Sequence, residues 1–332
     1  MSTKIEWCTD TRNPVVGCSH CSPGCDNCYA ERRAAILAKN PNPKIRSKYA
    51  GVVDEHGKWT GKTNFDASAL TKLPKKPQRI LVSSMCDMFH ESVSFATLEH
   101  IIGHMALTRA NAHHTFMLLT KRPDRMRDFF AQWSPYREVN NLWLGVTVCN
   151  QAEADAKIPV LLQTPAAKRF VSVEPMLGPV DLTAIRYTEE DAEWRVNCLT
   201  AEAWCENSDS ASAYCDAADG VEKLDWVICG GETGPKARPM HPDWARSLRD
   251  QCVAAGVPFF FKGWGEWEVY FDRDKDSPDW RRCPEVNNVN TRYLNLAGGY
   301  GFHGDRVVAV KRIGKRRAGR LLDGREWNEV PA

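Results

Sequence analysis

The sequence predicts an α/β fold, a partial or complete (β/α) barrel with a cysteine loop after its first strand. Its short apolar runs are nearly continuous and do not alternate with polar residues, which is typical of strands covered on both faces of a parallel sheet. Helix-like segments lie between several of them, and this alternation indicates an α/β fold. The apolar runs cover residues 79–84, 115–120, 142–148, 169–173, 226–229 and 258–261.

Two segments between these runs have the periodicity of helices. In residues 95–110 the apolar side chains recur at spacings of three and four, and residues 242–255 follow the same pattern. Gly256 is placed to end the second segment, because glycine readily adopts the left-handed conformation found after helices. We therefore expect a helix over each segment.

The composition is that of a folded globular protein. The chain has 332 residues, 43% hydrophobic and 26% charged, which excludes a disordered chain. No apolar run approaches the ~18 residues of a membrane span, and the N-terminus lacks the pattern of a signal peptide. We therefore expect a cytoplasmic protein without membrane contact. The net charge of +2 gives no global electrostatic reason to bind nucleic acid.

Cysteines are concentrated near the N-terminus. Of 13 in the chain, five lie within the first 28 residues, and in a reducing cytosol such a group indicates metal binding rather than disulfides. Cys21, Cys25 and Cys28 have the spacing C-x3-C-x2-C, and Cys18 adds a C-x2-C pair upstream. Three thiolates on one loop can ligate three irons of a 4Fe–4S cluster and leave the fourth iron open. A helix-forming segment follows at once, and a helix N-terminus favours a negatively charged cluster.

A tetrahedral zinc site is the alternative for these cysteines, because two C-x2-C pairs suit it. Only three residues separate Cys21 from Cys25, however, whereas zinc sites of this type usually have about 12 or more between their pairs. The spacing therefore favours an iron–sulfur cluster. Cys198, Cys205 and Cys215 are more widely spaced in an acidic segment, and we interpret them as incidental rather than as ligands of a second cluster.

Polar residues follow the carboxyl end of each predicted strand. Because ligands bind at that end in barrels and open α/β sheets, we expect the six strand ends to line one mouth. The alternative is that they are ordinary turn residues. Glu174 and Lys262 are the favoured contacts for a cofactor or substrate, since charged groups at such positions usually have a partner or a role. The candidate binding residues are Asp87, Lys121, Glu174, Gly230, Gly231 and Lys262.

The C-terminal region carries a local positive charge. Residues 306–325 contain eight Lys and Arg and a single acid, Asp323, which is a charge of +7 in a chain whose total is +2. Because Lys and Arg contact phosphates, this basic tail is a candidate polynucleotide contact. A solvated face, or pairing with the acidic segment 187–223, is the alternative.

Several blocks of the sequence resemble a known protein family. They include NPVVGC, SPGCDNCYAER, SSMCDMFHE, HTFMLLTKRPDRM, FVSVEPMLGPV, DWVICGGETGP and AGVPFFFKGWGEW. C-x3-C-x2-C is the cluster signature of radical S-adenosylmethionine enzymes, and the longer blocks are similar to those of the phage-associated radical-SAM-like family. The resemblance covers nearly the whole chain apart from the acidic segment. Some members of that family match Cys18, Cys25 and Cys28, and others match Cys21, Cys25 and Cys28. Both sets are candidate ligands, and the family pattern slightly favours Cys18 as the third.

The resemblance implies a fold, cofactors and a reaction. Residues 1–271 would form a radical-SAM-type barrel with an insertion at about 187–223, and residues 272–332 a C-terminal extension with the basic tail. The open iron of a 4Fe–4S cluster would chelate S-adenosylmethionine. An electron from an external donor would cleave this cofactor to a 5′-deoxyadenosyl radical, which takes a hydrogen atom from the substrate. Association with phages suggests a nucleotide or nucleic acid substrate. The alternative is a non-catalytic nucleic-acid-binding protein stabilised by zinc or by a cluster.

Overall fold

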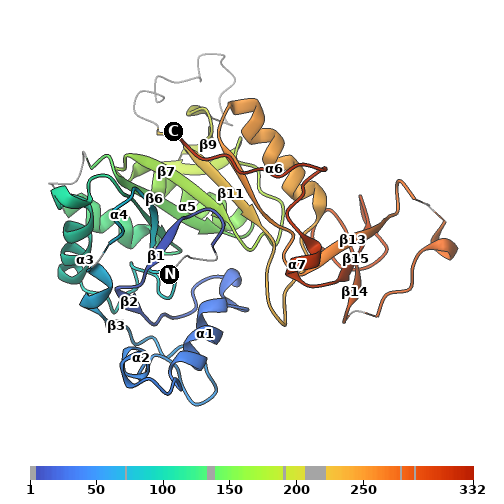
Figure 1. The fold of residues 1–332 in the computed structure, drawn as a ribbon. Coiled ribbons are helices and arrows are strands. Elements are labelled where there is room, and N and C mark those ends of the chain that lie inside the picture. Colours follow the sequence, from blue (N-terminus) through green and yellow to red (C-terminus); the bar gives the residue numbers. More distant parts are fainter. Residues whose placement is uncertain are drawn as a thin grey trace. The chain divides into compact units, whose positions relative to one another are not determined.

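The structure is a computed structural model that describes the chain except residues 1–4, 72, 133–138, 190–191, 206–221, 277–278 and 288. It divides into two compact units, which we call the first and second unit. The first consists of Met1–Thr147 with Lys157–Phe170, and the second of Val148–Ala156 with Val171–Ala332. Parallel strands occur in both (Figure 1).

The first unit is built on parallel strands joined by helices (Figure 1). Its strands are hydrogen-bonded in the order β1 (Asp10–Arg12), β4 (Arg79–Val82), β5 (Thr115–Thr120) and β6 (Leu142–Val148). In the chain, α3 (Phe95–Ile102) lies between β4 and β5, and α4 (Pro123–Gln132) lies between β5 and β6. Every residue of β6 is buried, as expected for a parallel strand covered on both faces.

Three further parallel strands belong to the same sheet, namely β7 (Lys168–Val173), β11 (Trp226–Gly230) and β12 (Phe259–Gly263). The strand order is β1-β4-β5-β6-β7-β11-β12. In the chain, α5 (Gln151–Gln163) follows β6, and α6 (Pro242–Ala255) follows β11. Each of these strands neighbours the next one along the chain, as in an open sheet or partial barrel. The predicted α/β class is confirmed.

Most predicted elements lie at nearly the predicted residues. The six apolar runs correspond to β4, β5, β6, β7, β11 and β12. Helix α6 has the predicted bounds and ends at Gly256, whose φ of 66° is left-handed. Helix α3 is shorter than predicted and ends at Ile102. The next residues, Gly103–Leu107, form a wider π-type turn. A glycine at the junction weakens the α-helix there.

A small cap, residues 29–66, follows the cysteine loop in the first unit. It contains α1 (Tyr29–Leu37), α2 (Pro43–Lys48) and β3 (Asn64–Phe65), and β3 pairs antiparallel with β2 (Val15–Val16). The cap has a core formed by Val16, Ala30, Ala34, Tyr49, Val52 and Met85. Cys28 packs against this core, so the cap fixes the end of the cysteine loop.

Two antiparallel sheets are added in the second unit. The first has the order β10 (Glu202–Cys205), β9 (Ala192–Asn197) and β8 (Ile185–Glu189), and it covers the described part of the predicted acidic insertion. Cys215 and the side chain of Cys205 lie outside the described residues. The second sheet has the order β13 (Trp267–Asp272), β15 (Val308–Arg312) and β14 (Thr291–Leu294), and α7 (Lys315–Ala318) follows it.

Across the described part of the chain, no helix combines the length and the apolar character needed to cross a membrane.

Candidate functional site

The cysteine loop connects β2 to α1 and is shaped by a tight turn. Gly17 begins it with a φ of 99°, and a Cβ there would lie 2.1 Å from the carbonyl oxygen of Lys62, so the position requires glycine. The amide of Cys25 donates a hydrogen bond to the carbonyl of Ser22 at 2.8 Å, and the amide of Cys28 donates to the carbonyl of Cys25 at 3.1 Å. Cys25 and Cys28 are therefore held on one turn, directly before α1.

The thiols of Cys21 and Cys25 are hydrogen-bonded to each other. This contact lowers the pKa of Cys25 to about 5, aided by the positive charge of Lys121, and raises the pKa of Cys21. Burial alone lowers the pKa of Lys121, but the Asp87 carboxylate and the three thiols of the C-x3-C-x2-C motif outweigh burial and raise it. The three thiols of this motif thus share one ammonium neighbour at the end of β5.

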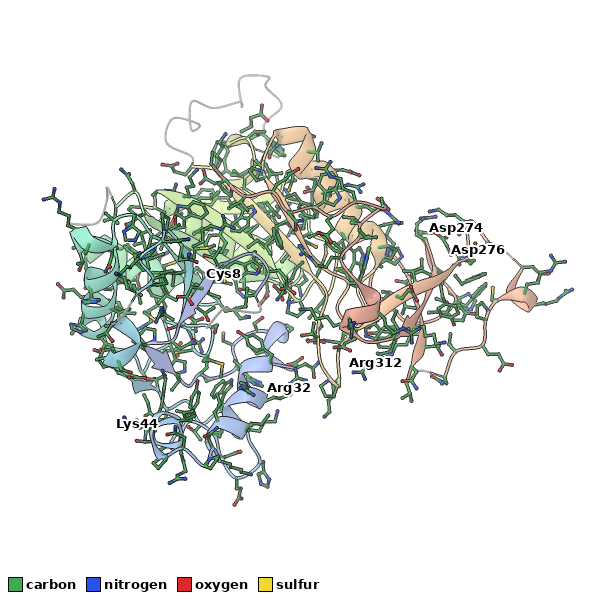
Figure 2. The ribbon with its side chains drawn as sticks, viewed as in Figure 1. Cys8, Arg32, Lys44, Asp274, Asp276 and Arg312 are labelled. Carbon is green, nitrogen blue, oxygen red and sulfur yellow. The ribbon has the colours of Figure 1, made fainter. Side chains whose placement is uncertain are left out.

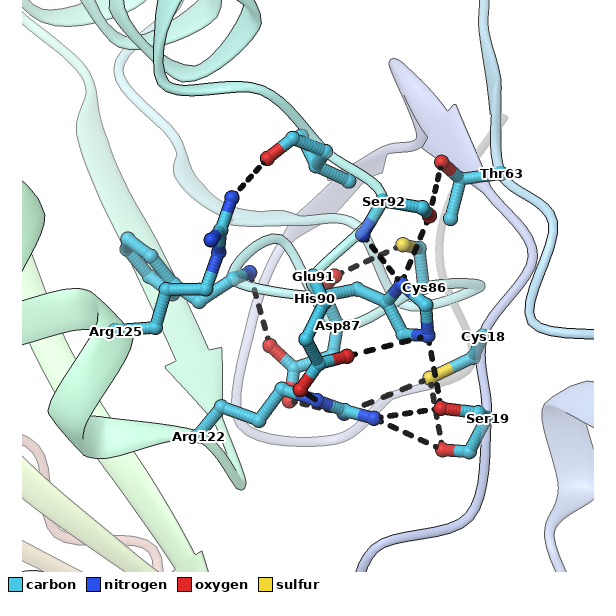
Figure 3. A network of polar contacts seen from close by, with 12 residues as sticks. Cys18, Ser19, Thr63, Cys86, Asp87, His90, Glu91, Ser92, Arg122 and Arg125 are labelled. Atoms are coloured by element: carbon cyan, nitrogen blue, oxygen red, sulfur yellow. Dashed lines mark hydrogen bonds and ion pairs between the residues drawn. The ribbon is translucent and has the colours of Figure 1, made fainter.

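Cys18 belongs to a group of side chains centred on Arg122, whose charge also acts on Cys21 (Figure 3). Arg122 Nη1 is 3.3 Å from Asp87 Oδ2 and 4.0 Å from Cys18 Sγ. Its Nη2 donates to Ser19 Oγ at 2.9 Å, and its Nε donates to Glu91 Oε1 at 2.9 Å. Burial and the Asp87 charge raise the pKa of Cys18 to about 11, so this cysteine is a neutral thiol at pH 7.

Asp87 is surrounded by hydrogen-bond donors of the protein. Its Oδ1 accepts from Thr120 Oγ1 at 2.7 Å and from the amide of Phe89 at 3.0 Å. Its Oδ2 accepts from the amide of Lys121 at 2.9 Å, in addition to Arg122. These contacts join the end of β4 to the end of β5, so Asp87 orients Arg122 and the backbone of Lys121.

The two residues between the first two cysteines of the loop are held by separate partners. Ser19 Oγ is 2.8 Å from His90 Nε2, and burial lowers the pKa of His90, which favours the neutral ring. His20 Nε2 is 3.1 Å from Glu31 Oε1. Glu31 lies on α1, is 4% exposed and also accepts from Lys58 Nζ at 2.9 Å. The two anchors fix the backbone between the two cysteines that compete for the third ligand position.

The sequence analysis did not identify five residues of this neighbourhood. They are Ser19, Glu31, Cys86, His90 and Arg122. Two of them could have been identified by their position in the sequence, because Arg122 directly follows the predicted site residue Lys121 and Cys86 directly precedes the predicted site residue Asp87. The partners of Arg122 could not be found in this way, because they lie more than 30 positions away along the chain.

The cysteines of the loop are candidate ligands of a single metal ion. Among the described residues, no three Cys, His, Asp or Glu side chains converge on a point that could hold one metal ion. The four thiols of the loop are therefore not arranged as the tetrahedral site that zinc requires.

In the second unit, Glu174 and Lys262 form an ion pair at the ends of β7 and β12. Their side chains are 20% and 19% exposed. A Cβ at Gly230 would lie 3.2 Å from Lys262 Cβ and 3.6 Å from Glu174 Cδ, so a residue without a side chain leaves room for the pair. A Cβ at Gly231 would lie 2.2 Å from the carbonyl oxygen of Trp264, so packing against backbone requires that glycine.

The predicted strand-end residues therefore fall into two groups. Asp87 and Lys121 lie with the cysteines in the first unit. Glu174, Gly230 and Lys262 lie together in the second unit. That all six strand ends line a single mouth stays a prediction.

The basic tail is more occupied by internal contacts than its composition suggests. Arg306 Nε is 2.9 Å from Asp243 Oδ2, and its Nη2 is 3.3 Å from Asp272 Oδ2. Arg312 Nη2 donates to a backbone carbonyl at 2.7 Å, and Arg325 pairs with a glutamate at 3.2 Å. These three arginines are engaged by the protein itself, which leaves less of the +7 charge available to phosphates.

Comparison with known proteins identifies a family. Neither the curated proteins nor the solved structures give a match to this chain. Residues 2–331 match the family described as Protein of unknown function (DUF5131). Because this match spans nearly the whole chain, the protein belongs to the DUF5131 family.

Proposed function

We propose that the protein is a radical S-adenosylmethionine-type enzyme and that Cys21, Cys25 and Cys28 hold its 4Fe–4S cluster. The observation that carries this proposal is the grouping of the three thiols around the ammonium of Lys121. A positive charge beside thiols favours the thiolate form, which is the form that binds iron. Soft thiolate ligands are also the donor set that iron–sulfur clusters require.

The surroundings of Cys18 favour Cys21 as the third ligand. Cys18 contacts Arg122, whose Nη1 is 4.0 Å from Cys18 Sγ, instead of another thiol of the loop. Cys21 is exposed and in direct contact with the thiolate of Cys25. In this proposal Cys18 is not a cluster ligand but helps to hold the loop in place, together with Arg122.

Two residues of the chain would support the cluster site, one by balancing charge and one by holding the cysteine loop in place. Lys121 offsets the negative charge of the thiolates, and Arg122 anchors the loop through Ser19. The chemistry that such a cluster supplies is one-electron cleavage of S-adenosylmethionine to methionine and a 5′-deoxyadenosyl radical, which takes a hydrogen atom from a substrate. An external electron donor and a nucleotide or nucleic acid substrate complete the proposal.

The Glu174–Lys262 pair is proposed as a second contact for a small ligand. It presents one negative and one positive group at strand ends, the combination that suits a small zwitterionic ligand. Gly230 keeps the space beside the pair free of a side chain.

The rival function is a non-catalytic nucleic-acid-binding protein stabilised by zinc. Zinc requires four ligands around one ion. Only three residues separate the two C-x2-C pairs, and this short spacing favours the cluster over zinc.

Anaerobic purification tests the proposal directly. We expect a brown protein with about four irons and four sulfides per chain and little zinc. With a strong reductant, it is expected to convert S-adenosylmethionine into 5′-deoxyadenosine and methionine, while the Cys25→Ala variant does neither. A colourless protein with one zinc per chain, or an iron-loaded protein that never cleaves the cofactor, contradicts the proposal.

A further inference from the structure

The cap, residues 29–66, concentrates positive charge outside the sites described above. It contains eight Lys and Arg against four Asp and Glu, a net charge of +4 in a chain whose total is +2. Two of its acids are already engaged, because Glu31 pairs with Lys58 and Asp66 pairs with Lys48. The cap therefore carries more positive charge than the fold uses for its own ion pairs.

The remaining cations of the cap face solvent. Five of them are exposed and form no ion pair with any residue that the structure describes, namely Arg33, Lys39, Lys44, Arg46 and Lys62. Figure 2 shows the position of Lys44. Lys44 and Arg46 lie on α2, Arg33 lies on α1, and Lys39 lies in the turn between the two helices. Arg46 donates only to a backbone carbonyl, that of Asn40, at 3.3 Å. The five exposed cations differ from Arg306, which forms ion pairs with three aspartates of the second unit.

Helix α1 presents an aromatic ring and an aliphatic side chain beside these cations. Tyr29, Arg33 and Ile36 recur at spacings of four and three, so they lie on one stripe of the helix. The Tyr29 side chain is 51% exposed and that of Ile36 is 60% exposed, whereas the opposite stripe is buried in the cap core. The Tyr29 hydroxyl donates to the carbonyl of Ser84 at 2.7 Å, which holds the exposed ring in place.

We propose that the cap binds a single-stranded polynucleotide, with phosphates on Arg33, Lys44 and Arg46 and a base stacked on Tyr29. Cations without internal partners are the groups that neutralise phosphates, and an anchored aromatic ring is a platform for a base. The strand is single because bases in a duplex are stacked on one another and do not reach such a ring.

The position of the cap connects this surface to the cysteine loop. Tyr29 directly follows Cys28, so a strand stacked on Tyr29 passes beside the end of that loop. This inference rests on the proposed function in one respect, because it names the substrate of that enzyme as a polynucleotide. Binding itself does not require a cluster.

Fluorescence anisotropy with labelled oligo-dT and oligo-U strands, measured over a range of salt concentrations, tests the phosphate contacts. The cap variant is Lys44→Glu with Arg46→Glu. The control is Arg316→Glu with Arg317→Glu, which makes the same charge change at two exposed arginines of the basic tail. Loss of two phosphate contacts is expected to weaken binding and to make the log–log salt slope less negative by about 1.4. The control is expected to bind like the wild type.

Substitutions at Tyr29 test the stacked base separately. Tyr29→Leu is expected to weaken binding at least about fivefold without changing the salt slope, because stacking involves no phosphate. Tyr29→Phe retains the ring but loses its anchoring hydroxyl, and it is expected to bind more tightly than Tyr29→Leu. Thermal unfolding of every variant verifies that the cap remains folded.

Several outcomes overturn this inference. They are an absence of oligonucleotide binding at low salt, cap variants that bind like the wild type, and a loss confined to the tail variant. Cap variants that bind oligonucleotides normally but lose reduction by an acidic electron-transfer protein would make the cap a protein interface instead. Iron content and cofactor cleavage are measured on the same samples. Cleavage without binding therefore removes this inference alone, and binding without cleavage removes the proposed function alone.

Discussion

Arg122 and Asp87 form a buried ion pair between the ends of two neighbouring strands. Arg122 Nη1 lies 3.3 Å from Asp87 Oδ2, and each side chain is 8% exposed. The same guanidinium reaches Ser19 and the thiol of Cys18 in the cysteine loop. One arginine therefore attaches the loop that carries the cysteines to the parallel sheet.

Replacing Arg122 is expected to destabilise the first unit. Arg122→Ala leaves the Asp87 carboxylate buried without its cation, and loss of one partner of a buried pair costs about 3–5 kcal/mol. Arg122→Lys is expected to recover only part of the lost free energy of unfolding. A single ammonium cannot bind Asp87, Glu91 and Ser19 together as the planar guanidinium does. Chemical denaturation measures the free energy of unfolding.

The exposed partner of Arg122 supplies the control. The Glu91 side chain is 67% exposed, so Glu91→Gln is expected to cost less than about 1 kcal/mol. If Arg122→Ala and Glu91→Gln have equal effects on the free energy of unfolding, the buried pair does not hold the loop.

Iron content distinguishes the four cysteines of the loop. We expect Cys21→Ala, Cys25→Ala and Cys28→Ala to lose most bound iron, because each removes one thiolate of the set around Lys121. Cys18→Ala is expected to keep its iron, since Cys18 contacts Arg122 whereas Cys21 contacts Cys25. Iron and sulfide are measured per chain after anaerobic reconstitution.

Cys283→Ala is the control for these variants, because Cys283 lies in the second unit. Loss of iron from Cys18→Ala with retention in Cys21→Ala would reverse the assignment of the third ligand. Full iron content in both Cys25→Ala and Cys28→Ala would remove the cluster site from this loop.

Gly231 is expected to tolerate no side chain. The Cβ of Gly231→Ala would lie 2.2 Å from the carbonyl oxygen of Trp264, and backbone cannot move away as a flexible side chain can. We expect a loss of about 1–3 kcal/mol, the usual cost of overpacking, seen as a lower melting temperature. Gly178→Ala is the control, because its Cβ would meet only Asn150 Cβ at an ordinary 3.5 Å. Equal melting temperatures for the two variants would contradict this packing argument.

The carboxylate of Asp243 is expected to make the stability of the second unit depend on pH. Burial alone raises the pKa of Asp243, but hydrogen bonds from Arg246 and Arg306 outweigh it and hold the pKa below its ordinary value. A lowered pKa in the folded state contributes stability above the unfolded-state value of about 3.9, and that contribution is lost as the pH falls through the lower folded value.

The pH dependence is measured by comparing Asp243→Asn with the wild type. Melting temperatures between pH 3 and pH 7 are expected to show the full deficit of Asp243→Asn at pH 6 and a smaller one toward pH 3. Asp128→Asn, which alters an exposed pair with Arg127, is the control and is expected to change little at any pH. A deficit of Asp243→Asn that grows as the pH falls would have the wrong sign.

Local pattern was enough to predict the framework of this protein. A continuous apolar run such as residues 142–148 is typical of a strand buried on both faces of a parallel sheet, and β6 occupies those residues. Gly256 ends α6 because a left-handed residue is needed there and glycine adopts that conformation without strain. Each of these predictions depends on neighbours within a few positions of the chain.

The basic tail shows where local pattern was insufficient. Composition alone gives residues 306–325 a charge of +7, but Arg306 lies among Asp243, Asp272 and Asp274. Those partners are more than 30 positions away in the sequence, so only folding brings them together. Exposed cations without an ion pair to a described residue occur in the cap as well, which composition did not single out.

The sequence by itself determined the alternation of strands and helices, the spacing of the cysteines and the polar residues at the strand ends, because each depends on the order of residues along the chain. Tertiary structure decided which of these groups meet. Cys21 and Cys25 lie in contact near Lys121, and Cys18 and Cys21 both interact with Arg122 and Asp87. The charge state of a thiol depends on burial and on nearby charges, and three of the charged groups near these thiols, Asp87, Lys121 and Arg122, lie more than 50 residues away along the chain.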